Sequence, residues 1–293
     1  MKKHNLFSIG SMALVSALAL NFASCGDEPD DNGGGNTGYT SSDQIAASNL
    51  VAKFSFENSV EDAKGNITSG TTNNVTFVDG AKGKAYMGSA NGYALFTNVG
   101  AAVTGIQSVT MSTWIKTTNH ADGAESWFQL LNDSNWIGNM FVLQESGAAG
   151  DSVRIKFNVN KWDAPAWKEQ WMDLGGANRL TIGDGNWHHV AISYDAVSSK
   201  AAFYVDGKEL TMPEGVTNRY GDDPTNGGAP LGPLKFKNAT RFVFGCYKQS
   251  LPGGTPDGWM KNYDGGLDEF RIYDKALAAA DVKSLYDLEK AGK

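Results

Sequence analysis

Apolar and polar side chains alternate without a break along part of this chain, and few folds accept that pattern. Residues 153–160 read Val-Arg-Ile-Lys-Phe-Asn-Val-Asn, so every second side chain is apolar. A period of two is typical of a strand that has one face on a core. Residues 189–194 repeat it, with Val190, Ile192 and Tyr194 on one side. The chain is therefore predicted to pack half-buried strands.

Turns are marked as clearly as strands. Predicted strands at 202–205 and 208–210 flank Asp206-Gly207, the pair that a type I′ hairpin turn requires. Glycine makes up 35 of the 293 residues, well above the usual share of about 7%. Short strands divided by turns predict an all-β fold with antiparallel sheets. Further strands are predicted at 53–56, 93–96, 109–116, 241–245 and 267–273, and one short helix at 281–289.

The first 24 residues have the order of a secretory signal peptide. Lys2 and Lys3 precede an uncharged stretch at 6–22, and small residues follow it. The apolar stretch is too short to span a membrane. Its ending, Phe22-Ala23-Ser24-Cys25, resembles the bacterial lipobox, which implies that Cys25 is lipidated and becomes the mature N-terminus. The alternative is ordinary cleavage near Ser24, which leaves Cys25 as a free thiol.

Residues 25–44 are predicted to be a flexible acidic and glycine-rich tether, because this polar tract cannot pack. Its acidic run resembles the export tag of surface lipoproteins in glycan-foraging Gram-negative bacteria. The resemblance implies a lipid-anchored protein exposed on the outer membrane, although the acids would also simply keep a linker solvated. Residues 45–293 are expected to form one domain.

Six segments of this domain resemble, in order, the laminin-G-like, concanavalin A-like lectin/glucanase domain. They are residues 50–58, 80–86, 109–116, 187–195, 203–207 and 266–277. The resemblance implies a jelly-roll β-sandwich with one short C-terminal helix. Because this fold hosts lectins, adhesins, enzymes and spacers, it does not by itself assign a function.

Catalytic patterns are missing from the sequence. The glucanases of this superfold carry a Glu-x-Asp-x-Glu strand, and no such triplet occurs here. Asp268 and Glu269 are adjacent, so on a strand they face opposite ways and cannot act as a pair. The protein is therefore predicted not to be an enzyme. A glycoside hydrolase would need two carboxylates in one cleft, and Asp163 with Glu169 or Asp133 would be the pairs to inspect.

Histidine and cysteine offer little chemistry. His188 and His189 are strand neighbours that face opposite ways, so they cannot chelate one ion together. The family resemblance places Trp187 and His189 in the structural framework. Cys246 is expected to be a small buried apolar residue.

Asp268 predicts a different kind of site. On a strand it shares a face with Phe270 and Ile272, and a carboxylate on an apolar face needs hydrogen bonds or a cation. If the first and last strands pair, the turn that contains Asp62 can approach it. Oxygen ligands of this kind suit Ca²⁺. One hypothesis is therefore a structural calcium held by Asp62 and Asp268, and the alternative is hydrogen bonding to backbone amides.

Tryptophans gather in one part of the sequence. Trp114 and Trp187 lie in predicted strands and are assigned to the core. Aromatic faces beside polar side chains suit sugar rings, which stack on the ring and hydrogen-bond through their hydroxyls. The alternative is that these rings pack insertions onto the sheet. The predicted glycan-binding residues are Trp127, Trp136, Trp162, Trp167 and Trp171.

Other segments complete the functional prediction. The insertion 212–238 and the loop 248–263, which contains Trp259, form a second candidate rim. With 25 basic against 32 acidic residues, nucleic acid is not an expected partner. The chain is predicted to be a non-catalytic surface lipoprotein that binds polysaccharide and meets the membrane only through its lipid. The alternative is a module that binds other surface proteins.

Overall fold

The computed structural model describes residues 38–120, 122–145, 150–163, 169–221 and 228–293. These residues belong to one compact unit, Asn36–Lys293. The predicted signal peptide and Cys25 lie outside the described residues. Within the described part of the chain, no helix is both long and apolar enough to cross a membrane.

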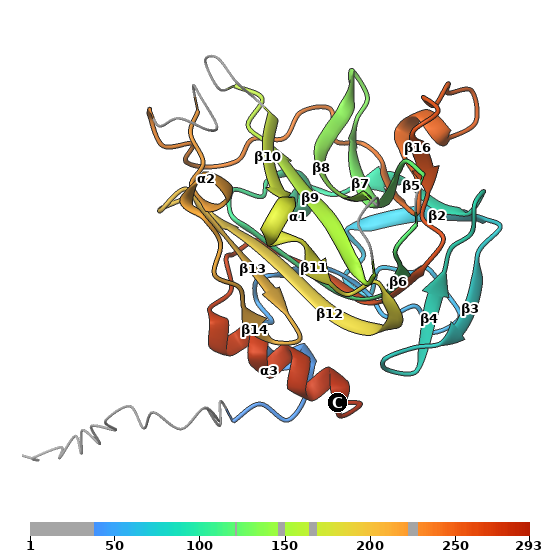
Figure 1. Ribbon diagram of the computed structural model, residues 1–293, viewed down its shortest axis with the longest axis horizontal. Coiled ribbons are helices and arrows are strands. Elements are labelled where there is room, and N and C mark those ends of the chain that lie inside the picture. The colour runs from blue at the N-terminus through green and yellow to red at the C-terminus, as the bar shows by residue number, and fades with distance from the viewer. Residues whose placement is uncertain (1–37, 121, 146–149, 164–168, 222–227) are drawn as a thin grey trace, which may run out of the picture. The chain divides into compact units, whose positions relative to one another are not determined.

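Two β-sheets face each other (Figure 1). The first sheet has eight strands, and β1 (Leu50–Phe54) pairs with β17, so the first and last strands are neighbours as expected. The order of its other strands is β14 (Lys208–Glu209), β13 (Lys200–Val205), β12 (Asp184–Asp195), β6 (Val109–Thr118), β17 (Gly266–Tyr273), β4 (Lys84–Met87) and β3 (Thr76–Asp79).

The second sheet has nine strands. Two lie off its main path, namely β11 (Leu180–Thr181) beside β9 and β16 (Met260–Asn262), which runs parallel to β7. The main path is β10 (Glu169–Leu174), β9 (Ser152–Asn160), β8 (Asn135–Glu145), β7 (Ala124–Asn132), β15 (Phe242–Phe244), β5 (Tyr93–Val99) and β2 (Ile67–Asn73).

Aromatic rings fill the space between the sheets. The rings of Phe244 and Phe270, one from each sheet, meet edge to face with centroids 4.8 Å apart. Phe54, Phe96 and Phe242 pack around them. The apolar side chains of β9 all point into this core and are buried, which explains the alternation seen in the sequence.

Helices are short except for α3 (Ala279–Lys290), which covers the outer face of the first sheet (Figure 1). It buries Val282 and Leu285 against Tyr204 and Tyr273 of that sheet. The remaining helical turns are α1 (Ala101–Thr104), α2 (Glu214–Thr217) and the 3₁₀ turns η1 (Ser42–Gln44), η2 (Gly176–Asn178) and η3 (Lys248–Ser250).

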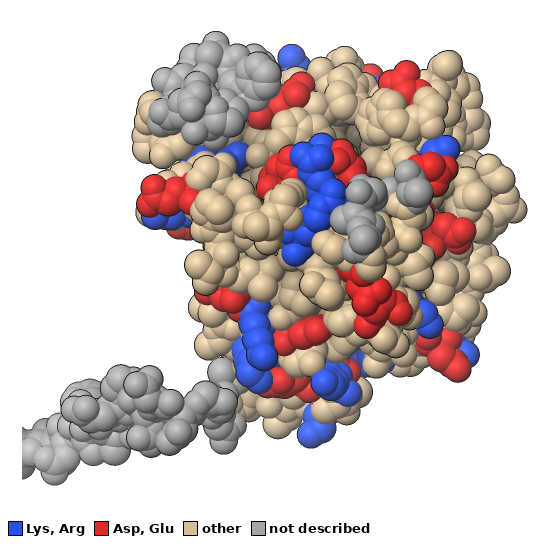
Figure 2. All heavy atoms as spheres, viewed as in Figure 1, with Lys and Arg blue, Asp and Glu red and all other residues tan. Residues whose placement is uncertain are grey.

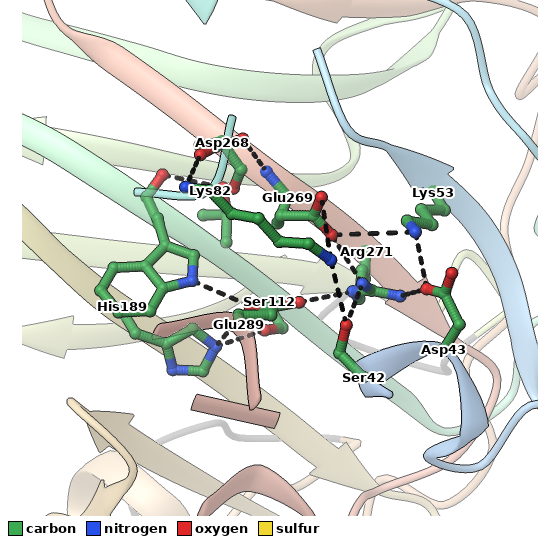
Figure 3. A network of polar contacts seen from close by, with 12 residues as sticks. Ser42, Asp43, Lys53, Lys82, Ser112, His189, Asp268, Glu269, Arg271 and Glu289 are labelled. Atoms are coloured by element: carbon green, nitrogen blue, oxygen red, sulfur yellow. Dashed lines mark hydrogen bonds and ion pairs between the residues drawn. The ribbon is translucent and has the colours of Figure 1, made fainter. Parts of the chain in front are cut away.

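A buried polar network fixes α3 and η1 to the first sheet (Figure 3). The Arg271 guanidinium, fully buried, donates to Glu289 of α3 at 2.8 Å, to Glu269 at 2.6 Å and to Asp43 of η1 at 2.7 Å. The indole of Trp114 donates to the second carboxylate oxygen of Glu289 at 2.8 Å. Each buried charge thus meets an opposite charge or a donor, as burial requires.

The two ends of the described chain lie together on this face. The Ser42 hydroxyl donates to the carbonyl oxygen of Lys293 at 2.8 Å, and the Arg271 guanidinium donates to the Ser42 hydroxyl. Residues 42–44, which the sequence assigned to the tether, therefore form part of the folded unit.

The fold prediction is confirmed: two sheets, antiparallel except for the β7–β16 pair, form a sandwich with one C-terminal helix. Asp206 and Gly207 have φ of 50° and 74°, as a type I′ turn requires. Cys246 is buried as predicted. Two long strands of the second sheet, β7 and β8, were not predicted, and neither were the shorter strands β2 and β10.

Candidate functional site

The prediction for Trp127 is wrong. Its side chain is fully buried in β7 and belongs to the core between the sheets, where its indole donates to Gln144 at 3.2 Å. The register of β7 against β8 shifts between Ser126 and Phe128. Because every residue of β7 is buried, its sequence shows no alternation of apolar and polar residues, and Trp127 was not recognised as a strand residue.

Trp136 and Trp259 form the exposed aromatic feature of the described chain, called here the tryptophan pair. They are 44% and 41% exposed, and their rings stand edge to face with centroids 6.5 Å apart. Trp136 lies near the start of β8, beside the β7–β8 turn, and Trp259 lies just before β16. The ring of Trp259 also rests on the buried ring of Tyr247, 5.6 Å away.

Hydrogen bonds hold the two loops of the tryptophan pair together. The Gln129 side chain donates to the carbonyl oxygen of Trp136 at 3.1 Å and accepts from the backbone of Lys248 at 2.9 Å. The Lys248 ammonium donates to the carbonyl oxygens of Asn132 and Asp133. The position of the pair is therefore built into the fold.

Trp162 and Trp171 are half-buried on the outer face of the second sheet. Both pack on an apolar cluster that includes Phe141 and Tyr247. The ring of Trp171 stands edge to face on Phe141 at 5.1 Å. These two residues pack onto the sheet while keeping part of each ring accessible. Trp167 lies outside the described residues.

One register row of the second sheet places amide groups among these rings. Asn158 pairs with Trp171 on one side and with Phe141 on the other, and Phe141 in turn pairs with Gln129. Asn158 is buried, and neither its amide nitrogen nor its amide oxygen has a hydrogen-bond partner among the described residues. The indole nitrogen of Trp162 is likewise buried without one.

Farther along the same face, charges are paired. Arg154 of β9 bonds to Glu145 of β8 at 2.9 Å and to Asp173 of β10, and Lys156 bonds to Glu145. On the side of the described residues seen in Figure 2, basic side chains stand beside acidic ones rather than in a basic stripe. This mixture does not resemble a nucleic-acid surface.

Two of the three carboxylates considered for hydrolysis, Asp163 and Asp133, form ion pairs with basic residues. Asp163 pairs with Lys235 at 2.8 Å, and this contact lowers the pKa of Asp163. At Asp133, burial alone would raise the pKa of the carboxyl. The hydrogen bonds from Thr240 and Arg241 outweigh burial and hold this pKa below its ordinary value. A general acid needs a raised pKa, so neither residue is tuned for that role.

Asp62 and Asp268 each bind backbone amides. The Asp62 carboxylate accepts hydrogen bonds from four backbone amides, including those of Lys53 and Asn66 at 2.8 Å. Asp268 accepts the amides of Lys82 and Glu269 at 2.9 and 2.8 Å, and burial raises the pKa of its carboxyl to about 8. Among the described residues, no group of three His, Cys, Asp or Glu side chains is arranged to hold a metal. These contacts match the alternative of hydrogen bonding to backbone amides, and they do not test calcium binding.

The adjacent histidines face opposite ways. His189 is fully buried under α3, where its Nε2 lies 2.8 Å from the Ser112 hydroxyl. His188 bonds to Asp206 and Asp184. Trp187 is only half-buried.

A polar cleft of about 740 Å³ was missed in the sequence. It lies at the end of the second sheet where β2, β5, β7 and β16 meet the end of β6. Its lining comes from segments far apart along the chain, so no spacing could reveal it. The local signal is the grouping of His120, Asp122 and Glu125 within residues 120–125.

Solved structures share this architecture. Domain 4 of an extracellular arabinanase from Geobacillus stearothermophilus, solved with arabinotriose, is 21% identical, with 81% of this chain and 98% of that chain covered and a TM-score of 0.48. The binding domain of botulinum neurotoxin serotype C1 is 15% identical, with 83% and 52% covered and a TM-score of 0.55. The binding domain of Paraclostridial Mosquitocidal Protein 1 is 14% identical, with 82% and 52% covered and a TM-score of 0.51.

This chain spans about half the length of the two toxin domains, and the likeness concerns the fold. Among curated proteins, no match to the sequence is found. The family described as the concanavalin A-like lectin/glucanases superfamily matches residues 87–283, which is most of the folded unit. Two jelly-roll sheets and this match agree that the chain belongs to the concanavalin A-like lectin/glucanase superfamily.

Proposed function

We propose that the protein is a non-catalytic module that binds carbohydrate on the outer face of its second sheet. The observation that carries the proposal is the tryptophan pair. Three large apolar side chains of the described residues are exposed, and two of them, Trp136 and Trp259, stand together. Sugar rings stack their C–H faces on such rings and leave their hydroxyls free for polar neighbours.

The surroundings of the pair support this role. The bonds from Gln129 and Lys248 keep the rings in place before a ligand arrives, which lowers the entropic cost of binding. Trp162 and Trp171 extend the same face with partly exposed aromatic rings, on which sugar rings stack. A polymer lying across the face would meet several such groups.

The lipid anchor belongs to the same proposal. Lipidation of Cys25 would tether the module to the outer membrane and expose it at the cell surface, where it would hold polysaccharide. Ion pairing of Asp133 and Asp163 supports a binding role rather than hydrolysis. The proposed partner is a glycan, and the membrane is met only through the acyl chains.

Affinity electrophoresis tests the carbohydrate proposal. We expect a plant, host or microbial polysaccharide to retard the protein, and Trp136→Ala and Trp259→Ala to weaken the retention by about ten-fold or more, as for other stacked tryptophans. The melting temperature should change little, because both rings are already partly in water. Val197→Ala, at a 94% exposed site in the β12–β13 turn, is the matched control and should bind as the parent does.

The alternative function is protein binding. It would use an apolar patch of several hundred Å². Retention by no polymer in the panel, or retention unaffected by both tryptophan substitutions, would contradict the glycan site on the tryptophan pair.

A further inference from the structure

The polar cleft is separate from the tryptophan pair and has the size of a ligand site. Its volume is about 740 Å³, and ligand pockets range over about 300–1,000 Å³. Residue Met260 lines it, whereas the neighbouring Trp259 is exposed outside it. Its polar lining includes Asn73, Tyr93, His120, Glu125, Asn262 and Asp264.

The charges of the cleft do not balance. Asp122 pairs with Lys261 at 3.2 Å, and Glu125 pairs with His120 at 3.1 Å. Glu125 also accepts from the backbone amide of Asp264 at 3.2 Å. The carboxylate of Asp264 has no cationic partner within the described residues. The cleft therefore repels anions and carries one acidic group free for a ligand.

Two amide groups of the lining leave an oxygen available as an acceptor. The side-chain nitrogen of Asn73 donates to the carbonyl oxygen of Asn91 at 2.9 Å, and that of Asn262 donates to the carbonyl oxygen of Gly92 at 3.1 Å. Their amide oxygens accept no hydrogen bond from the described residues and so remain available. With Asp264 they form a set of oxygens that a ligand rich in O–H or N–H groups would satisfy.

One wall is apolar. The ring of Tyr93 and the side chains of Pro252, Pro256 and Met260 lie among the lining residues. A polyol with an apolar face suits both kinds of lining, because its C–H groups can contact the apolar side chains while its hydroxyls bond to the oxygens.

We propose that this cleft is a second ligand site, which takes a single neutral or cationic sugar unit, such as an amino sugar, and rejects anionic sugars. The site does not rest on polysaccharide binding by the tryptophan pair. Asp264 supplies the preference for positive charge, and Asn73 and Asn262 accept hydroxyl protons.

Titration of the isotope-labelled protein with glucose, glucosamine and glucuronate at equal ionic strength tests the proposal. We expect saturable amide shifts around Glu125 and Asn262, with glucosamine bound about two- to five-fold more tightly than glucose, the range that one exposed ion pair provides. Glucuronate should give no saturable shift. Absence of saturable shifts with all three sugars, or binding of glucuronate as tight as that of glucosamine, would overturn the proposal.

Two variants separate the sites. Asp264→Asn removes the charge with little change of shape, so the affinity for glucosamine should fall to that for glucose. Asp287→Asn, an exposed position on α3, changes the net charge equally and should have no effect. The double variant Trp136→Ala, Trp259→Ala should keep glucosamine binding while losing polysaccharide. Loss of glucosamine binding in the double variant would show that the cleft is not a separate site.

Discussion

His189, in the first sheet, makes the free energy of unfolding depend on pH. It is fully buried beside Trp114 and Tyr286, and burial lowers the pKa of its imidazole to about 3. In the unfolded chain the pKa returns to about 6.5. Between these values the unfolded state binds one more proton, so this residue makes the free energy of unfolding fall as pH falls.

We predict that His189→Gln flattens the dependence of unfolding free energy on pH between about 6.5 and 3. Denaturant unfolding of both proteins at a series of pH values measures it. Asp268 and Glu289, whose pKa values are raised by burial to about 8 and about 7, are present in both proteins and contribute the opposite slope, so the difference between the two curves reports the substitution. Parallel curves for the two proteins would show that His189 does not remain neutral in the fold.

Asp62 and Asp268 are the residues for which a structural calcium was one hypothesis. Their carboxylates are bonded to backbone amides, which removes the need for a cation to neutralise them. We therefore predict equal melting temperatures in excess calcium and in chelator. An increase in calcium alone that Asp62→Asn abolishes would instead identify a structural metal, since a ligand that binds only the folded state raises its stability.

At the scale of elements, the Asp206-Gly207 turn joins β13 and β14 and also seats α3. Gly207 has φ of +74°, and a Cβ there would lie 2.9 Å from Cδ1 of Tyr286 on α3. Gly176 has φ of +57°, with no atom within 4 Å of such a Cβ. The two glycines share the left-handed backbone conformation but differ in surroundings.

We predict that Gly176→Ala costs about 1–2 kcal/mol, the penalty of left-handed backbone alone. Gly207→Ala should cost more, because the clash with Tyr286 adds to it. Chemical denaturation measures both losses. Equal losses would show that α3 moves aside without cost.

The same scale explains which elements the sequence could predict. In β9 and in the 189–194 part of β12, apolar side chains alternate with others because one face meets the core, and both were predicted. Every residue of β7 is buried, since loops cover its outer face, so no alternation is left to detect. The tryptophan prediction failed at Trp127 for this reason. The contact of Trp259 with Trp136 depends on a loop that lies beside the β7–β8 turn, and the distance between two residues along the sequence does not reveal such a contact.

The whole domain places its chain ends and its tryptophan pair on opposite sheets. The described chain begins and ends beside α3, on the outer face of the first sheet (Figure 1). The tryptophan pair and the row of Asn158 lie on the outer face of the second sheet. A tether at the N-terminus would therefore leave the proposed glycan face unobstructed.

This arrangement predicts that a folded protein fused after Lys293 leaves polysaccharide affinity unchanged, because the fusion adds bulk only on the face of α3. The same protein inserted between Asp133 and Ser134, in the β7–β8 turn beside Trp136, should abolish retention by blocking access to the tryptophan pair. Affinity electrophoresis compares the two, and retained binding of glucosamine by the insertion variant checks that its fold survives. If the C-terminal fusion is retained more weakly by the polysaccharide, the polysaccharide binds on the face of α3 and not at the tryptophan pair, and the prediction is wrong.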